Sequence, residues 1–263
     1  MEEKEIQMFK KKIVMLIAAA LMTLSASSAF AAFTDLELIR VVYERGTGST
    51  ETLTDLGNVN TILNDATTKG AQTFAGTGAL TATTPANLAV AYFALDSTNG
   101  QLWSTSKNGQ SMGDLTGMSS GTISLYSYYN ATTGIKTTQG TTATGQAYGI
   151  GVQSAASSYV KKLSASGQAG TLGNALPLAG SAETSLGSLV GATSGSVTQN
   201  LYFWANGYAN DPADYTGVNN FTITTNFNGT SVVTAATPIP PAFFLMGSGL
   251  LGMFGLRRKN KVA

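Results

Sequence analysis

The chain of 263 residues contains no cysteine and no histidine, and charged residues make up only 11% of it. Without cysteine it forms no disulfide, so its fold must rest on side-chain packing and backbone pairing. Without histidine it has no Ser-His-Asp triad and no Cys-His pair, and it lacks the usual ligands of zinc. These absences exclude most hydrolase mechanisms. They leave carboxylate pairs, hydroxyl nucleophiles activated by lysine, and calcium sites built from oxygen ligands.

The first 31 residues predict a signal peptide. A basic stretch at residues 10–12 precedes an apolar run at residues 13–24, which is the order that signal peptides follow. Ala29 and Ala31 place small side chains at the two positions that a signal peptidase reads. We therefore expect cleavage between Ala31 and Ala32.

The start of this signal is predicted at Met8 rather than Met1. Residues 1–7 are acidic and fit poorly before a signal peptide, whereas Met8 begins one directly. The alternative for this end of the chain is an uncleaved anchor. The apolar run disfavours an anchor, because it is too short to cross a hydrocarbon core of about 30 Å comfortably.

The last residues, 237–263, have a layout in three parts. A proline cluster comes first, an apolar run at residues 242–256 follows, and basic residues end the chain. An apolar run before Arg and Lys is typical of a segment that enters a membrane and keeps its charges on the cytoplasmic side. The alternative is a buried core helix, which the terminal cations disfavour. The positions that carry the layout are Pro238, Ile239, Pro240, Pro241, Gly247, Gly249, Arg257 and Arg258.

This layout of a proline pair, a Gly-Ser-Gly-Leu-Leu-Gly core and a double arginine resembles the PEP-CTERM class of protein-sorting signals. With Pro238-Ile239-Pro240 where the family has Pro-Glu-Pro, it is similar to the VPLP-type variant. The resemblance implies export in a Gram-negative bacterium and recognition by a membrane-embedded exosortase or a related enzyme. It also implies removal of the tail and delivery to the cell surface or extracellular matrix. The alternative is a plain tail anchor.

Residues 32–236 are predicted to form the exported domain, which is long enough to bury its own core. This part carries 11 acidic and 7 basic side chains, so the formal charge of +1 of the whole chain comes from the two terminal segments. It has no basic stripe. The charge pattern therefore argues against nucleic acid as a partner.

Short β-rich runs separated by Gly and Asn turns dominate this domain. Residues 36–44 carry apolar side chains on both faces and predict a strand near the centre of a sheet. Residues 88–95 are nearly all apolar, which predicts a strand buried on both sides. A turn at residues 96–100 and a returning strand at residues 101–105 complete a predicted hairpin.

Four more strands are predicted further along the domain. Residues 122–129 and 201–208 alternate in a period of two, and each has one aromatic face. Residues 221–227 and 231–234 flank Asn228-Gly229, a favoured turn sequence, and predict a second hairpin.

Helical spacing of apolar residues predicts two short helices, at residues 59–66 and 156–163, while residues 167–197 have weak periodicity and receive no assignment. The predicted fold is all-β, a β-sandwich of jelly-roll or immunoglobulin-like type with one or two short helices. An N-terminal signal helix and a C-terminal transmembrane helix flank it. An extended β-solenoid is the alternative, which the absence of a fixed-period repeat disfavours.

Aromatic side chains are the first candidates for binding. Trp103, Tyr126, Tyr128, Tyr202 and Trp204 could form a platform that stacks on sugar rings, because such rings combine apolar area with a polar group. The alternative is that they cover a face of the sheet.

Oxygen-bearing side chains supply weaker candidates. Residues 210–214 gather three of them in one loop, as a calcium site would need, although turns favour the same residue types. Two pairs of carboxylates are close enough in the chain to act as a general acid and base: Glu51 with Asp55, and Asp211 with Asp214. Surface carboxylates, however, are usually only solvated. We expect no metal and no cofactor. The glycosylation sequon occurs at Asn130, Asn220 and Asn228.

The sequence thus favours a noncatalytic exported protein with a structural or adhesive role at the cell surface or in an extracellular polysaccharide matrix. Its expected partners are the membrane, through the C-terminal segment, an exosortase-like enzyme and extracellular polysaccharide. The leading alternative is a carbohydrate-binding, lectin-like module. An enzyme is the third hypothesis.

Overall fold

The computed structural model describes residues 33–46, 48–106, 115–130, 138–164, 182–205 and 218–235. Its helices are Val59–Thr68 (α2), Leu115–Asn130 (α3) and Tyr159–Lys162 (α4), with 3₁₀ turns at Pro85–Asn87 and Gly187–Leu189. Its strands are Glu37–Glu44 (β1), Thr50–Asn58 (β2), Gln72–Phe74 (β3), Leu88–Asp96 (β4), Gln101–Ser106 (β5), Thr138–Thr141 (β6), Ala147–Val152 (β7), Thr184–Ser185 (β8), Ser196–Trp204 (β9), Val218–Asn226 (β10) and Ser231–Ala235 (β11). The expectation of a mainly β structure is confirmed.

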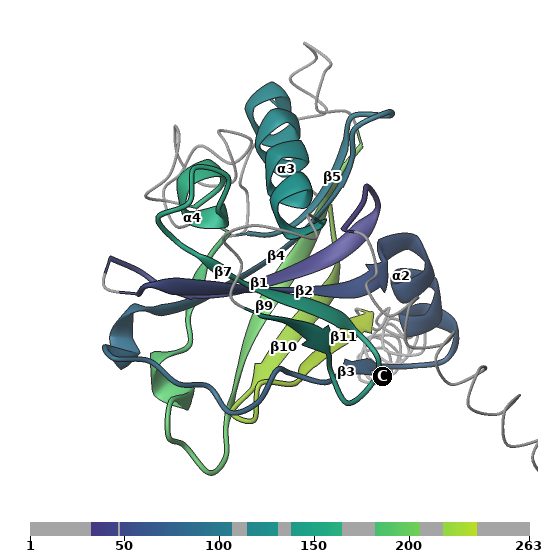
Figure 1. The fold of residues 1–263 in the computed structure, drawn as a ribbon. Helices are drawn as coiled ribbons and strands as arrows, with labels where there is room; N and C mark the ends of the chain where they lie inside the picture. The colour runs from purple at the N-terminus through teal and green to yellow at the C-terminus, as the bar shows by residue number, and fades with distance from the viewer. Residues whose placement is uncertain are drawn as a thin grey trace, which may run out of the picture.

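The strands form one 11-stranded sheet in the order β3-β11-β10-β9-β5-β4-β1-β2-β7-β6, with β8 paired to β4 (Figure 1). Every pairing is antiparallel, unlike the stacked coils of a solenoid. β1 lies between β2 and β4, so the predicted central strand is confirmed. Both predicted hairpins, β4 with β5 and β10 with β11, are confirmed as well.

The sheet is curled, as two hydrogen bonds between distant strands show. Four strands separate β1 from β11 in the sheet order, yet the Arg40 side chain of β1 donates to the carbonyl oxygen of Gly229, beside β11, at 2.7 Å. Near the two ends of the order, the Ala75 amide after β3 donates to Oγ1 of Thr144, between β6 and β7, at 2.9 Å. The sheet therefore has a concave face, across which its halves approach each other, and a convex face.

The concave face is filled by an apolar core and closed at one end by α2, which lies beside β11 and β3 in Figure 1. The predicted helix at residues 59–66 is confirmed, because Val59, Ile62 and Ala66 are buried at helical spacing. Oδ1 of Asn58 accepts the Thr61 amide at 3.2 Å and caps the helix. The concave core also contains Leu38, Val90, Trp103, Leu201, Ile223 and Val233.

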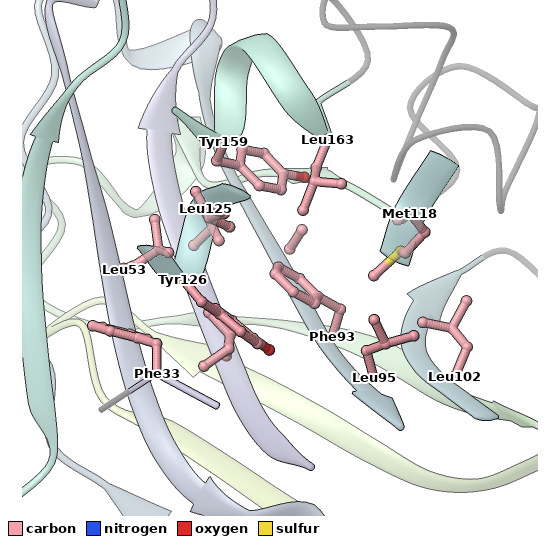
Figure 2. Close-up of a cluster of buried hydrophobic side chains, with 14 of the residues drawn as sticks. Phe33, Leu53, Phe93, Leu95, Leu102, Met118, Leu125, Tyr126, Tyr159 and Leu163 are labelled. Carbon is pink, nitrogen blue, oxygen red and sulfur yellow. The ribbon is translucent and has the colours of Figure 1, made fainter. Parts of the chain in front are cut away.

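The convex face carries α3 and α4, which lie together on one side of the sheet in Figure 1. Figure 2 shows their apolar side chains converging on those of β4 and β5. The contributors from the helices and from the C-cap of α4 are Met118, Leu125, Tyr126, Tyr159 and Leu163, and the facing strand residues include Leu53, Phe93, Leu95 and Leu102. The short helix predicted around residues 156–163 is confirmed as α4.

The prediction of a strand at residues 122–129 is wrong, because this segment belongs to the 16-residue helix α3. Its buried side chains follow helical spacing, with Leu115, Met118, Thr122, Leu125 and Tyr129 on one face. In a strand Ile123 and Leu125 would share a face, whereas in the helix Ile123 is 54% exposed and Leu125 is 0% exposed. Packing against the convex face thus overrides the local β preference of alternating aromatic residues.

Some elements were misplaced or not predicted. β9 begins at Ser196, inside the unassigned segment, and ends at Trp204, while residues 206–208 of the predicted strand lie outside the described ones. β2 and β7 were not predicted. A Cβ at Gly149 of β7 would lie 2.6 Å from the ring of Tyr129, so β7 needs glycine where α3 packs. Among the helices that the structure describes, none is long and apolar enough to cross a membrane.

Candidate functional site

The residues that the sequence assigns to export and sorting lie outside the described part of the chain, as do the whole segments 1–31 and 237–263. They are Ala29, Ala31, Ala32, Pro238, Ile239, Pro240, Pro241, Gly247, Gly249, Arg257 and Arg258. The loop at residues 210–214, with its pair of aspartates, lies outside as well. The candidate sites within the described residues lie among the side chains of the curled sheet.

The five aromatic side chains predicted to stack on sugars do not form an exposed platform. Four are buried, with exposed fractions of 5% for Trp103, 6% for Tyr126, 3% for Tyr202 and 0% for Trp204. Trp103 belongs to the concave core, whereas Tyr126, Tyr202 and Trp204 belong to the convex core. Tyr128 is half-buried, and its hydroxyl accepts a backbone amide of β7 at 3.0 Å. These rings pack the two faces of the sheet and offer no common surface.

Glu51 is a structural anchor rather than the partner of Asp55. It is 1% exposed on the convex face of β2, and its Oε1 accepts the Tyr159 amide at 2.6 Å and the Tyr129 hydroxyl at 3.0 Å. Its Oε2 accepts the Val160 amide at 3.0 Å. Burial raises the pKa of Glu51, and these hydrogen bonds oppose that rise. Glu51 thus fastens α3 and α4 to the sheet.

Asp55 instead shares a hydrogen bond with Glu37, the first residue of β1. Burial, and then the nearby Asp55 carboxyl group, raise the pKa of Glu37 to about 7. Oδ1 of Asp55 also accepts the Gly57 amide at 2.8 Å. The buried hydroxyl of Tyr126 has no hydrogen-bond partner. Because the two carboxyl groups share a hydrogen bond and the pKa of Glu37 is raised, we interpret the pair as a proton-sharing contact. Among the described residues, no group of three or more Asp or Glu side chains could hold a metal ion.

Arg40 is a charged side chain inside the concave face, with 2% of its surface exposed. Its Nη1 donates to Gly229 O at 2.7 Å and to Ser231 Oγ at 2.9 Å. Its Nη2 donates to Thr54 Oγ1 at 3.1 Å and to Ala75 O at 3.5 Å. No carboxylate in the described part of the chain pairs with it, and its Nε has no hydrogen-bond partner. Burial lowers the pKa of Arg40, an effect that nearby Tyr92 opposes.

Hydroxyl groups surround this guanidinium group. The Tyr92 hydroxyl of β4 lies 2.7 Å from Thr225 Oγ1 and 2.8 Å from Ser231 Oγ. Ser231 also accepts from Arg40, so a buried polar network joins β1, β4, β10 and β11 across the concave face. Such a network specifies one arrangement of the strands, because each polar group depends on partners from distant parts of the chain.

Two connected hollows lie beside Arg40. A pocket of about 100 Å³ is lined by Arg40 together with residues of β1, β2 and the segment 77–81. A larger groove of about 570 Å³ adjoins it, since both are lined by Thr52, Thr77 and Thr81. The groove also contains Glu44, whose oxygens accept two backbone amides, at residues 83 and 84, at 2.9 and 2.6 Å. Arg40 thus lines the smaller hollow and Glu44 the larger one, and threonine hydroxyls line both.

The segment 76–78 forms one wall of this depression and is held by contacts between backbones. A Cβ at Gly76 would lie 2.3 Å from the carbonyl oxygen of Gly229, and one at Gly229 would lie 2.5 Å from the oxygen of Gly78. Gly229 also has a φ of 79°, which disfavours other residues. Glycine at Gly76 and Gly229 is therefore what allows the segment to approach β11 beside Arg40.

Sequence reasoning placed Arg40 in the central strand but gave it no role. The signal that could have found it is a lone charge in an otherwise apolar run, Leu-Ile-Arg-Val-Val, of a strand predicted to be buried. Its partners could not be found in this way, because Thr54, Ser231 and Gly229 lie 14, 191 and 189 residues away in the chain.

In two of the glycosylation sequons the asparagine side chain makes hydrogen bonds within the protein. Asn130 accepts the Phe33 amide at 2.7 Å and donates to its carbonyl oxygen at 2.8 Å. Asn228 accepts from the amide and hydroxyl of Thr230 at 3.1 and 2.8 Å. A glycan on Asn130 would break the contact that holds the first described residue.

Comparison of the chain with protein-family models, with curated proteins and with solved structures finds no match.

Proposed function

We propose that this chain is an exported, noncatalytic protein with a structural or adhesive role at the cell surface or in an extracellular polysaccharide matrix. Its C-terminal segment serves as a PEP-CTERM-like sorting signal, read by an exosortase-like enzyme in a Gram-negative host. The membrane holds the segment during sorting. The domain between the two signals is the part that acts outside the cell.

The observation that carries this proposal is the sequence of the two terminal segments. A basic stretch, an apolar run and the small residues Ala29 and Ala31 make up the first, and a proline cluster, an apolar run and a double arginine make up the second. Phe33 is 3% exposed and packs in the convex core, where Asn130 binds both of its backbone polar groups. Phe33 therefore belongs to the folded domain that we propose is released from the N-terminal signal.

The use of buried carboxylates supports a noncatalytic role. Glu51 accepts from two backbone amides and a tyrosine hydroxyl, and Glu183 accepts from two tyrosine hydroxyls and Arg45. These contacts fasten elements together. We further propose that the two halves of the curled sheet correspond to the two layers of a β-sandwich, since both contribute to the concave core.

The sorting proposal is tested by changing the basic end of the tail in a Gram-negative host that contains an exosortase. Replacing Arg257 and Arg258 with Ala removes the double arginine, and we expect the protein to be retained unprocessed in the cell. The matched control replaces Lys161 and Lys162, which also removes two cations but leaves the tail intact, and should be processed and exported normally. Equal export and processing of both variants would refute the proposal.

A further inference from the structure

Arg40 is a buried cation whose described partners are all neutral. Burial of a charge is unfavourable unless an opposite charge or a full set of hydrogen bonds compensates it. Here Nε has no partner, and the contact of Nη2 with Ala75 O, at 3.5 Å, is at the limit of a hydrogen bond. An oxyanion in the adjoining pocket would supply both an opposite charge and an acceptor.

The size of the pocket limits the group that can reach Arg40. Its volume of about 100 Å³ admits a carboxylate or another small oxyanion. The groove of about 570 Å³ that continues from it has room for sugar rings. Thr52, Thr77 and Thr81 line both spaces, and each hydroxyl can donate and accept hydrogen bonds. A ligand with one acidic group and many hydroxyls matches this lining.

The charges along the groove give it a direction. Arg40 and Glu44 lie four residues apart on the same face of β1, which separates their Cα atoms by about 13 Å. The positive end attracts a carboxylate, and the negative end repels one. A ligand with a single acidic group per sugar therefore has one favoured orientation, with its carboxylate at Arg40.

From these features we propose that the concave groove binds a uronate, a sugar with a carboxylate group, within an acidic polysaccharide. The carboxylate accepts from Arg40 in the small pocket, and the ring hydroxyls bind the threonines of the groove. The site lies in the sheet and does not depend on the tail, so its failure and the failure of sorting are separate results.

Calorimetric titration of the full-length chain tests this assignment. A polyoxyethylene detergent is suitable, because alkyl glycosides would themselves offer sugars to the groove. The three ligands are trigalacturonate, its neutral counterpart galactotriose, and sodium acetate. We expect saturable binding of trigalacturonate and at least about ten-fold weaker binding of the other two, because galactotriose lacks a charged acceptor for Arg40 and acetate lacks the ring hydroxyls that bind the threonines.

Three variants test whether trigalacturonate binds in this groove. Arg40→Met keeps an unbranched side chain without the charge and should weaken trigalacturonate binding at least about ten-fold. Lys161→Met removes a cation from α4 on the convex side and should leave the affinity unchanged. Thr52→Val changes a groove hydroxyl while keeping Arg40, and should weaken binding about five-fold. Thermal unfolding confirms that each variant is folded, and Thr52→Val decides the question if Arg40→Met does not fold.

Several results would overturn the proposal. Absence of saturable trigalacturonate binding would do so, as would equal affinity for galactotriose. Acetate binding as tight as that of trigalacturonate would identify a small-anion site only. Unchanged affinity in folded Arg40→Met, or in Thr52→Val, would place the ligand elsewhere.

Discussion

The convex and concave faces of the sheet differ in how they accommodate buried charge. On the convex face, Glu51 accepts hydrogen bonds from two backbone amides and a tyrosine hydroxyl. Glu183, whose side chain is 0% exposed, accepts the hydroxyls of Tyr43 and Tyr159, both at 2.8 Å, and pairs with Arg45 at 2.7 Å. Each carboxylate is thus matched by donors from several elements.

On the concave face, Arg40 has neutral partners only and an unpartnered Nε, and a groove adjoins it. A fully matched charge contributes to the folded structure, because its hydrogen bonds replace those that water made. A buried charge that lacks an opposite charge and has an unpaired donor, and that lies next to a pocket, can bind a ligand that supplies the missing acceptor. The comparison therefore assigns anchoring to the convex face and binding to the concave face.

Glu51→Ala should have the largest effect on stability. It leaves two amides and a hydroxyl of the convex side without their acceptor, and we expect the free energy of unfolding to fall by about 4 kcal/mol. Urea denaturation measures this change. Asp65→Ala, which removes a surface ion pair with Lys69, is the control and should cost no more than about 0.5 kcal/mol. A similar loss of unfolding free energy in the two variants would contradict the role of Glu51 in fastening the helices to the sheet.

Leu125→Ala tests the helix that covers the convex face. Leu125 is fully buried, and its truncation should cost about 3 kcal/mol. Ile123→Ala, two residues away at an exposed position, should leave stability within about 0.5 kcal/mol. Denaturation of both variants separates a helix from a strand, because a strand would place the two side chains on one face and give comparable losses.

Gly76→Ala tests how the wall of the concave groove is held. The added Cβ would meet the Gly229 carbonyl oxygen at 2.3 Å, so the backbones must separate, at a cost of about 2 kcal/mol. Gly70→Ala meets no atom within 4 Å and carries only the strain of its positive φ, about 1 kcal/mol. Thermal melting compares the stabilities of the Gly76→Ala and Gly70→Ala variants. An equal or smaller loss for Gly76→Ala would show that the close approach does not hold the groove.

The smallest effect concerns pH. Because the pKa of Glu37 is raised from 4.5 to about 7 in the folded protein, the folded state binds this proton more tightly than the unfolded state. Its contribution to stability is fully present below pH 4.5 and is lost as pH rises through 7. We expect the free energy of unfolding to fall between pH 5 and pH 8, and Glu37→Gln to reduce that fall. Asp65→Asn is the control, and an identical fall in Glu37→Gln would contradict the assignment.

The elements that could be predicted from the sequence are those whose local pattern agrees with their packing. All nine residues of β4 are buried, as its apolar run predicts, and α2 buries the residues that its helical spacing selects. α3 could not be predicted, because residues 122–129 alternate as a strand does and only the convex face of the sheet selects the helix. β7 was missed because its glycines, which make room for Tyr129, weaken the apolar signal.

The candidate site was less predictable than the fold. The aromatic candidates were expected to be exposed, but Trp103 of β5 packs in the concave core, while Tyr202 and Trp204 of the adjacent strand β9 pack in the convex core. Asp55 was paired with Glu51 from their spacing along the chain, whereas its partner is Glu37 on the adjacent strand. The polar network of Arg40 depends on the curl of the sheet, which no spacing in the sequence encodes.

The intact mass of the wild-type protein, recovered from a Gram-negative host that contains an exosortase, tests the central claim most directly. The account predicts a surface or extracellular protein that begins at Ala32 and lacks about 26 residues at its C-terminus. A recovered protein that retains the segment through Ala263 would contradict sorting and indicate a plain anchor.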